Sequence, residues 1–458
     1  MRSALKEYFD SLKGKHIAVI GIGVSNTPLI ERMLEEGLTV SACDRRNREA
    51  FNGLIESLER KGLQTYLGPE YLEHLDHADL IFRTPGMRPD LPQLTKAVER
   101  GAELTSEMEV FFSLCPCRVI AVTGSDGKTT TTTIIAGMLE QAGYRVFVGG
   151  NIGHPLLCEV DSINPDDMVV LELSSFQLLT MEQSPSIAVV TNLAPNHLDV
   201  HKDMEEYIAA KRNIFAYQDS GDRVILNADN DLTAAFVKEA RGEVTLFSRR
   251  RQLDRGVCLR DGKIVYHNRP ILAAEDIRLP GQHNLENYMA AIAAVDGLVP
   301  DEVIRSFAGT FSGVPHRIEL VRELDGVRWY NDSIASSPSR TIAGLRSFQQ
   351  KVILIAGGYD KHIPYDVLGP QITESVKELL LTGDTAEKIR RATESAPDYR
   401  PGSPEIVMCG DLKEAVERAH AAAKPGDVVL LSPASASFDH FRNFEERGNV
   451  FRALVNAL

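Results

Sequence analysis

Short apolar runs rich in β-branched residues alternate with helical patterns along nearly the whole chain. Examples are "HIAVIGIG", "TVSACD", "RVIAVTG", "MVVLELSS", "KVILIAGG" and "DVVLLSPA", and most of them end in Gly, Ser or Asp. Such runs, separated by helical stretches, are typical of strands in a parallel sheet that helices cover on both faces. The 458 residues are enough for about three domains. We therefore predict three α/β domains in series.

The predicted domains span residues 1–108, 109–312 and 313–458. The first opens with a β-α-β unit, and its turn contains Gly21 and Gly23. Asn26 stands where a dinucleotide fingerprint has its third glycine, so that fingerprint is only partly present. The third domain follows "GVPHRIE", and its strands end in Gly, Ser or Pro, as in a doubly wound sheet with a ligand edge.

The stretch "VTGSDGKTT" joins a predicted strand to a predicted helix. It resembles a phosphate-binding loop, but Val122 occupies the position of the first glycine, which indicates a shorter variant. Backbone N–H groups and a helix N-terminus can face an anion there, while a lysine and a hydroxyl serve the phosphates and Mg²⁺. The predicted nucleotide-binding residues are Gly124, Ser125, Asp126, Gly127, Lys128, Thr129 and Thr130.

Other polar residues follow strands or begin helices. Glu172 ends an apolar run and is a candidate metal ligand, as an acid on a strand beside the loop would be. His197, Asp199 and His201 form either a metal site or polar surface. Asn284 and Asn287 either recognise a purine or cap a helix, and Arg317 either contacts phosphate or caps a helix.

Composition excludes several classes of function. The net charge of −14 is spread along the chain, so we expect neither nucleic acid nor a membrane surface as partner. No apolar stretch reaches the length of a membrane span, and the N-terminal residues do not resemble a secretory signal. The six cysteines are scattered, which is typical of a reducing compartment. We therefore expect a cytoplasmic protein.

The motifs taken together resemble the Mur ligase family. They are "VTGSDGKTTT", "LELSSFQL", "TNLAPNHLD" followed by "AAKRNIF", "GQHNLENYMAA", "GVPHRIE", "YNDS" and "LLSPASASFDHFRNFEERG", in this order along the chain. The resemblance implies a Rossmann-like UDP-binding domain, a central P-loop ATPase-type domain and a C-terminal Rossmann-like domain. It also implies an ATP- and Mg²⁺-dependent ligase of peptidoglycan synthesis. The chain is most similar to members that join D-glutamate to UDP-N-acetylmuramoyl-L-alanine through an acyl phosphate.

The resemblance also implies roles for individual residues. Lys128, Glu172, His197 and Lys211 would be catalytic, with Mg²⁺ held by Thr129, Glu172, His197 and a carbamate on Lys211. The nucleotide would contact the loop together with Asn284, Asn287, Arg317 and Asp332. The substrates would contact Val24, Ser25, Asp44, Gly86, Asn151, Lys361, Ser437 and Phe438. We expect small-molecule substrates and a monomer.

One motif departs from the family. The family form is NDSKATN, whereas this chain reads "NDSIASS", so Ile334 replaces a lysine. Either another cation compensates, with Arg340 and Lys361 as the candidates, or the pocket has shifted. Two alternatives remain: a folylpolyglutamate-synthase-like ligase, whose first domain would lack the "VIGIGVSN" unit, and a P-loop regulatory ATPase that makes no new bond.

Overall fold

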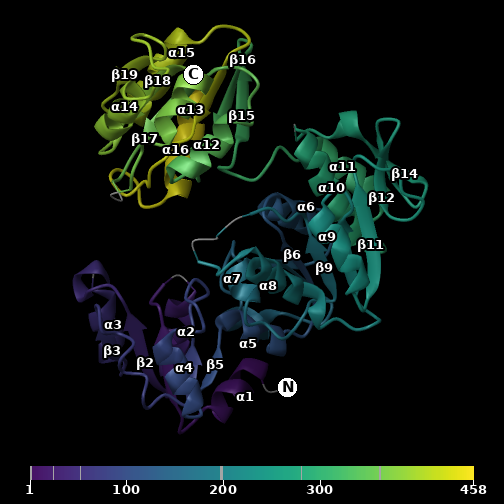
Figure 1. The fold of residues 1–458 in the computed structure, drawn as a ribbon, viewed down its shortest axis with the longest axis vertical. Coiled ribbons are helices and arrows are strands. Elements are labelled where there is room, and N and C mark those ends of the chain that lie inside the picture. Colours follow the sequence, from purple (N-terminus) through teal and green to yellow (C-terminus); the bar gives the residue numbers. More distant parts are fainter. Residues whose placement is uncertain are drawn as a thin grey trace. The chain divides into compact units, whose positions relative to one another are not determined.

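The computed structural model describes residues 3–23, 25–51, 53–195, 197, 200–279, 281–360 and 363–458. Three predicted candidate residues, Val24, Asp199 and Lys361, lie outside this part of the chain. The chain divides into two compact units, residues 1–310 and 311–458. Figure 1 shows the first unit from purple to green and the second from green to yellow.

The first unit begins with a parallel sheet in the order β3-β2-β1-β4-β5. Its strands are β1 (His16–Ile20), β2 (Thr39–Asp44), β3 (Gln64–Leu67), β4 (Leu80–Phe82) and β5 (Glu103–Thr105). The helices are α1 (Ala4–Ser11), α2 (Asn26–Glu35), η1 (Arg48–Phe51), α3 (Leu54–Arg60), α4 (Pro92–Glu99) and α5 (Glu107–Leu114). The turn after β1 is held by Asn26, whose Nδ2 donates to the carbonyls of Ile20 (3.1 Å) and Gly21 (3.0 Å).

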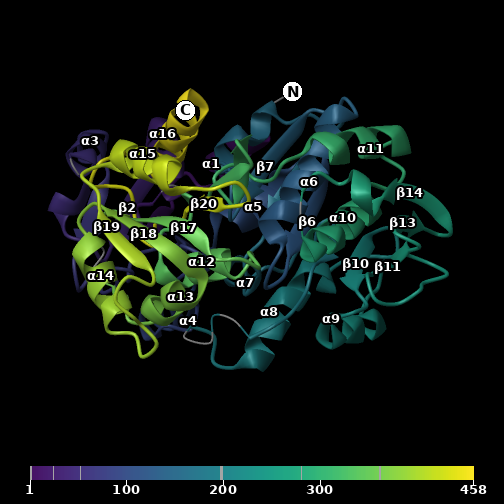
Figure 2. The ribbon, with the colours of Figure 1, turned by 90° about the horizontal axis from the view of Figure 1, so that it is seen from above.

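The second sheet has the order β14-β13-β12-β11-β10-β9-β6-β8-β7 and is parallel from β7 to β12. Its strands are β6 (Arg118–Thr123), β7 (Val146–Gly150), β8 (Met168–Glu172), β9 (Ile187–Val190), β10 (Arg223–Asn227), β11 (Glu243–Ser248), β12 (Val257–Arg260), β13 (Lys263–Tyr266) and β14 (Arg269–Ala273). The helices are α6 (Lys128–Gln141), η2 (Leu157–Ser162), α7 (Ser175–Leu178), α8 (Met204–Ala216), α9 (Asp231–Ala235), η3 (Phe236–Lys238), η4 (Ala274–Asp276), α10 (Gln282–Val295) and α11 (Asp301–Thr310). Helices α6 and α10 pack against each other beside β6 (Figure 2).

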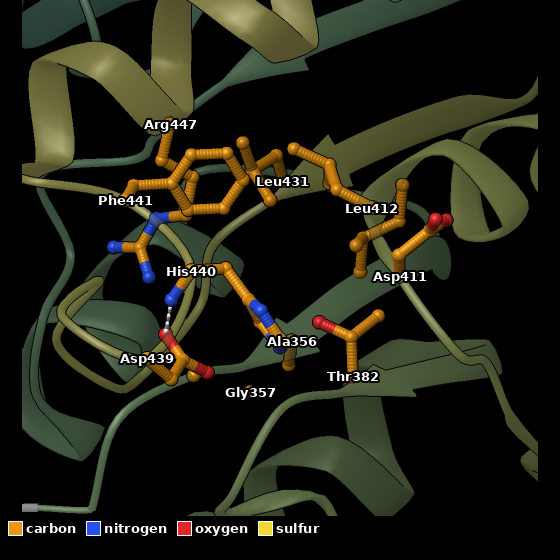
Figure 3. A pocket seen from close by; sticks show the side chains of 12 residues that line it. Ala356, Gly357, Thr382, Asp411, Leu412, Leu431, Asp439, His440, Phe441 and Arg447 are labelled. Atoms are coloured by element: carbon orange, nitrogen blue, oxygen red, sulfur yellow. Dashed lines mark hydrogen bonds between the residues drawn. The ribbon is translucent and has the colours of Figure 1, made fainter.

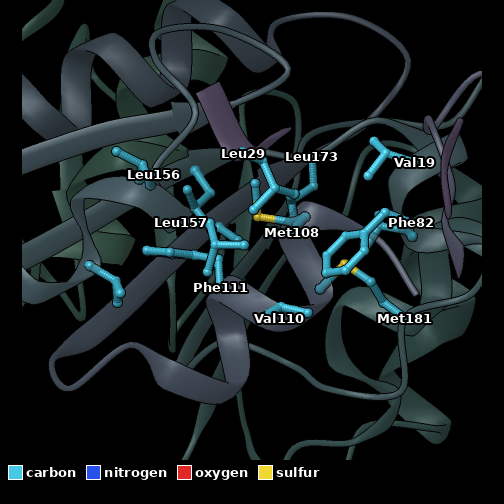
Figure 4. Close-up of a cluster of buried hydrophobic side chains, with 14 of the residues drawn as sticks. Val19, Leu29, Phe82, Met108, Val110, Phe111, Leu156, Leu157, Leu173 and Met181 are labelled. Carbon is cyan, nitrogen blue, oxygen red and sulfur yellow. The ribbon is translucent and has the colours of Figure 1, made fainter. Parts of the chain in front are cut away.

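A continuous hydrophobic core joins these two sheets into one unit. Side chains from β1, α2, β4, α5, η2 and the segments after β8 and α7 meet in it (Figure 4). They include Val19, Leu29, Phe82, Met108, Phe111, Leu157, Leu173 and Met181. Because burial of such side chains contributes about 1.5–3 kcal/mol each, the first sheet is fixed against the second.

The second unit contains a six-stranded sheet in the order β15-β16-β20-β17-β18-β19, in which only β15 is antiparallel. Its strands are β15 (Glu319–Leu324), β16 (Val327–Asn331), β17 (Val352–Gly357), β18 (Val376–Thr382), β19 (Glu405–Met408) and β20 (Val428–Leu431). The helices are α12 (Pro338–Leu345), α13 (Leu368–Ser375), α14 (Ala386–Glu394), α15 (Leu412–Ala422) and α16 (Phe444–Ala457). Separate hydrophobic cores lie on its two faces, so this sheet is covered by helices on both sides.

The prediction of an α/β fold with a parallel sheet in each of three parts is confirmed. Among the helices that the described residues form, none combines the length and apolarity that a bilayer crossing needs.

Candidate functional site

The glycine loop connects the C-terminal end of β6 to the first turn of α6. Gly124 has φ 146° and Gly127 has φ 78°, a region that side chains disfavour. A Cβ at Gly124 would overlap the hydroxyl of Thr191, and a Cβ at Gly127 would overlap Oδ1 of Asn287. The loop therefore needs both glycines for its conformation and for close packing. Its N–H groups and the N-terminus of α6 form a cradle of the kind that binds phosphate.

Lys128 and Thr129 are the first residues of α6. The Lys128 ammonium folds back onto the loop and donates to the carbonyls of Gly124 and Ser125, each at 3.0 Å. Thr129 Oγ1 donates to Glu172 Oε2 at 2.7 Å, and Asn151 Nδ2 donates to Glu172 Oε1 at 2.7 Å. Glu172 is 1% exposed, so its carboxylate is held in place beside the loop. The structure brings together these predicted residues from α6, β8 and the turn after β7.

Lys211 approaches the same site from α8. It is 2% exposed, and its Nζ donates to Thr123 Oγ1 at 3.1 Å. Burial lowers the pKa of Lys211 well below its usual value, and the nearby Lys128 ammonium lowers it further. The Glu172 carboxylate acts in the opposite direction but is a smaller effect. A lysine in this setting readily becomes a neutral amine. A surface helix lysine, the ordinary expectation for this sequence position, would not.

Residues from α8 and α10 support the loop. Tyr207 O–H lies 2.8 Å from Ser125 Oγ, and Ser125 Oγ donates to Ala194 O at 2.9 Å. Thr131 Oγ1 donates to Asn287 Oδ1 at 3.2 Å, and Asn287 Nδ2 donates to Asn284 Oδ1 at 2.9 Å. The two asparagines are thus buried in α10 directly behind the first turn of α6. Tyr207 was missed by sequence analysis because no motif pairs it with the loop.

The remaining loop residues and His197 are more accessible. Asp126 is exposed, and its N–H donates to Asn192 Oδ1 at 3.0 Å. Thr130 follows in the first turn of α6 and is partly buried. The ring of exposed His197 lies 5.0 Å from that of Phe176. Within the described part of the chain, no three His, Cys, Asp or Glu side chains are grouped as a metal centre.

A cavity of about 700 Å³ lies at the C-terminal ends of β1 and β2. Three predicted substrate residues, Ser25, Asp44 and Gly86, line it together. Asp44 accepts bonds from the N–H of Ile22 (2.8 Å) and from the guanidinium of Arg46, so it also fixes the turn. Arg45, Arg46, Tyr71 and Arg88 also line the cavity and were missed, although the dipeptide "RR" after Asp44 was a readable signal. Because Arg46 and Arg88 are paired with carboxylates, Arg45 is the cation of this lining that best suits an anionic ligand.

In the second unit, Asp332 follows β16 and is 4% exposed. Ser432 Oγ donates to its Oδ2 at 2.8 Å and Ile318 N–H to its Oδ1 at 3.3 Å. Burial raises the pKa of Asp332 to about 7, against the opposing effect of these hydrogen bonds. Arg317 lies one residue before Ile318, at the start of this unit.

The loop that contains Ile334 is supported by a cation that the sequence did not reveal. Arg447 of α16 is 4% exposed and donates to Ser333 Oγ (3.0 Å), Ser333 O (2.9 Å) and Ala436 O (2.9 Å). Arg340, one of the two predicted candidates, donates to the carbonyl of Ile334 at 3.3 Å. The buried guanidinium of Arg447 therefore connects the "NDSIASS" and "SASFDHF" segments.

The predicted residues of "SASFDHF" differ in exposure. Ser437 is 2% exposed, whereas Phe438 is 60% exposed and its ring lies 5.9 Å from that of Tyr359. A small cavity of about 40 Å³ lies beside them (Figure 3). It is lined by residues of β17, β18, β20, α15 and α16, among them Thr382 and Arg447, and by Asp411, Asp439, His440 and Phe441 of the connecting segments.

The three parallel sheets, with a glycine-rich loop between strand and helix in the second, define a multidomain α/β protein of the phosphate-loop class. Residues 15–106 match the Mur ligase MurD-like, N-terminal domain. Residues 122–295 match the Mur ligase middle domain, and residues 316–435 match the Mur ligase, glutamate ligase domain. A protein from Acetivibrio thermocellus named UDP-N-acetylmuramoylalanine--D-glutamate ligase is 53% identical over 464 residues, which cover 100% of both chains. Proteins of the same name from Ruminiclostridium cellulolyticum and Clostridium botulinum (strain Okra) are 52% and 50% identical, again over 100% of both chains.

This chain belongs to the Mur ligase family. Solved structures agree on the fold. The UDP-N-acetylmuramate-alanine ligase of Thermotoga maritima has a TM-score of 0.56 and 19% identity, covering 97% of this chain and 99% of that one. A UDP-N-acetylmuramoyl-L-alanyl-D-glutamate--2,6-diaminopimelate ligase has a TM-score of 0.53 and 17% identity, with coverages of 97% and 92%.

Proposed function

We propose that this protein is an ATP-dependent ligase that joins D-glutamate to UDP-N-acetylmuramoyl-L-alanine. The proposal is carried by the identity of 50–53%, over the full length of both chains, to relatives that are named for this activity. The terminal carboxylate of the UDP substrate would take the γ-phosphoryl group of ATP, releasing ADP. The amine of D-glutamate would then attack this acyl phosphate, forming the amide and releasing phosphate.

The residues around the glycine loop fit ATP and Mg²⁺. Gly124 and Gly127 let the loop pack against Thr191 and Asn287 in a turn whose N–H groups, with the N-terminus of α6, suit a phosphate. Thr129 and Glu172 offer oxygens 2.7 Å apart on the same side of the loop, the ligand type that Mg²⁺ prefers. When bound, Mg²⁺ supplies charge neutralisation at the transferred phosphoryl group. Lys128 holds the phosphates, and His197 serves a second metal ion.

Lys211 has the environment that carbamylation needs. CO₂ reacts with the neutral amine, and burial beside Lys128 favours that form. The amine nitrogen bonds to the carbon of CO₂ and gives up a proton, so a neutral amine becomes an anionic carbamate whose oxygen attracts the metal. Thr123, which accepts the Lys211 N–H, holds the side chain toward the loop.

The other predicted residues contact the rest of the ligands. The nucleotide contacts Ser125, Asp126 and Thr130 of the loop, together with Asn284, Asn287, Arg317 and Asp332. The UDP end of the substrate contacts Val24, Ser25, Asp44 and Gly86, and its reacting carboxylate lies near Asn151. The D-glutamate contacts Lys361, Ser437 and Phe438. The division into domains 1–108, 109–312 and 313–458 stays a prediction. We place the enzyme in the cytoplasm as a monomer with small-molecule partners.

Phosphate release from ATP tests the function. With UDP-N-acetylmuramoyl-L-alanine present, we expect release to depend on D-glutamate, and L-glutamate, glycine or meso-diaminopimelate to support little. Equal release without any amino acid would exclude a ligase. A preference for another amino acid would exclude D-glutamate as the substrate.

The Lys211→Ala variant tests the carbamate. Activity should fall by about 100-fold or more, because a group that orders the reacting phosphate is lost, and short-chain carboxylates should partly restore it. The exposed Lys238→Ala is the matched control and should keep full activity. Labelled CO₂ should give a carbamate NMR signal in the wild type that Lys211→Ala lacks. Failure of every carboxylate to rescue, together with no signal, would contradict the role.

A further inference from the structure

Residues 84–87 form a loop that supplies part of the wall of the 700 Å³ cavity, and the arginines at its two ends bond to the segment after α7 and to α8. Arg83 precedes this loop and is 2% exposed. Its Nη1 donates to the carbonyls of Pro85 (2.9 Å) and Met87, and its Nη2 donates to Thr180 Oγ1 at 3.0 Å. Gly86, which lines the cavity, therefore sits in a loop anchored to the segment after α7.

Arg88 anchors the other end of the loop and also lines the cavity. Its Nη1 donates to Val200 O (2.8 Å) and Glu206 Oε2 (2.8 Å), and its Nη2 donates to Glu206 Oε1 (2.9 Å). Its Nε and Nη2 donate to the two oxygens of Asp90, each at 2.8 Å. All five guanidinium N–H groups of Arg88 can thus donate to these acceptors. The paired hydrogen bonds to Glu206 fix the angle between the loop of residues 84–87 and α8.

Glu206 lies in the first turn of α8, the helix that carries Lys211. Its Oε2 also lies 3.3 Å from His201 Nδ1. The His201 ring is 3% exposed, stacks on Phe176 with centroids 5.2 Å apart, and meets the edge of Tyr207 at 5.4 Å. A shift of Glu206 would therefore move a tightly packed aromatic group.

Tyr207, one of these packed aromatic residues, contacts the glycine loop. Tyr207 follows Glu206 in α8, and its O–H lies 2.8 Å from Ser125 Oγ. The Lys211 ammonium lies 5.0 Å from the centroid of the Tyr207 ring. Contacts thus run without a gap from the cavity wall at Arg88, through Glu206, His201 and Tyr207, to the phosphate cradle.

We propose that Arg88 is a positioning residue which, through Glu206, couples occupancy of the cavity by the UDP substrate to the geometry of the nucleotide loop. The inference rests on the proposed function for the identity of the two ligands. A UDP substrate that packs against Gly86 and Arg88 fixes the loop of residues 84–87. The hydrogen bonds from Arg88 to Glu206 then fix the first turn of α8. Tyr207, the next residue of α8, in turn keeps Ser125 of the glycine loop in position for phosphate. Because coupling is reciprocal, the nucleotide tightens binding of the UDP substrate by the same factor.

Calorimetry measures this coupling without turnover. The dissociation constant of UDP-N-acetylmuramoyl-L-alanine is determined alone and with a saturating non-hydrolysable ATP analogue and Mg²⁺. We expect the analogue to tighten binding by about tenfold in the wild type, within the usual range for coupled sites. Arg88→Lys keeps the charge but loses the fork, and Glu206→Gln loses the charge pair. In each variant, the factor by which the ATP analogue tightens binding of the UDP substrate should fall below about twofold. In the double variant this factor should be no smaller than in either single variant.

Arg48→Lys is the matched control. Arg48 makes a similar fork on Glu59 (2.8 and 2.7 Å) in the same domain but does not line the cavity, so the tenfold factor should remain. A merely structural role for Arg88 would lower thermal stability or weaken each ligand alone while leaving the ratio unchanged.

A ratio near one in the wild type, or an unchanged ratio in both Arg88→Lys and Glu206→Gln, would overturn the positioning role. These outcomes leave the proposed function intact if D-glutamate still stimulates phosphate release. The converse result is phosphate release that does not depend on D-glutamate while the ATP analogue still tightens binding of the UDP substrate about tenfold. That result would overturn the proposed reaction but keep the coupling between the two binding sites. Absence of any binding by the UDP substrate would overturn both.

Discussion

The absence of a side chain at single positions sets the shape of the proposed phosphate cradle, and Gly127 gives a sharp test of this. In Gly127→Ala the new Cβ would overlap Oδ1 of Asn287, so this side chain must turn and lose the hydrogen bond from Thr131, in addition to the strain at φ 78°. We expect the affinity for ADP to fall by about tenfold or more, and the free energy of unfolding to fall by about 1–3 kcal/mol. Calorimetry and urea unfolding measure the two effects.

Gly143→Ala is the control for backbone strain alone. Gly143 has φ 95° and lies just beyond the end of α6, but a Cβ there meets no atom within 4 Å. This variant should lose about 1 kcal/mol of stability and keep its ADP affinity. If Gly127→Ala bound ADP as well as Gly143→Ala does, close packing against Asn287 would not matter for the cradle.

At the scale of elements, the strands and the loop were predictable because local patterns carry them. The helix expected after the glycine loop is α6 (Lys128–Gln141), and the apolar run that ends at Glu172 is β8. Sequence alone did not explain Asn26, which stands where a third glycine would allow close packing of helix on strand; its side-chain amide donates to the carbonyls of Ile20 and Gly21 and so holds the turn.

Pairings between distant elements were not predictable. Arg88 and Glu206 are separated by 118 positions, and nothing in either local pattern indicates that they meet. The same holds for Tyr207 with Ser125 and for Arg447 of α16 beneath the loop that contains Ile334. Such contacts arise from the packing of one element on another. Periodicity and motif spacing report only what happens within an element.

At the scale of the whole molecule, the two compact units should respond differently to pH. Asp332, in the second unit, has its pKa raised from 3.8 to about 7, chiefly by burial. Between these values the folded unit holds a proton that the unfolded chain has lost. The contribution of this group is therefore most favourable below about pH 4, falls as pH rises to about 7, and is then constant. A shift of this size corresponds to about 4 kcal/mol.

The only tryptophan of the chain makes this measurable in the intact protein. Trp329 is 0% exposed in β16 of the second unit, so its fluorescence follows urea unfolding of that unit. In Asp332→Asn, Oδ1 still accepts from Ile318, and Ser432 can donate to Thr341 instead. Relative to this variant, the wild type should lose stability from pH 4 to 7, since every other titrating group is shared. Parallel pH profiles of the two proteins would show that Asp332 titrates at its ordinary value, and that burial costs this carboxylate little.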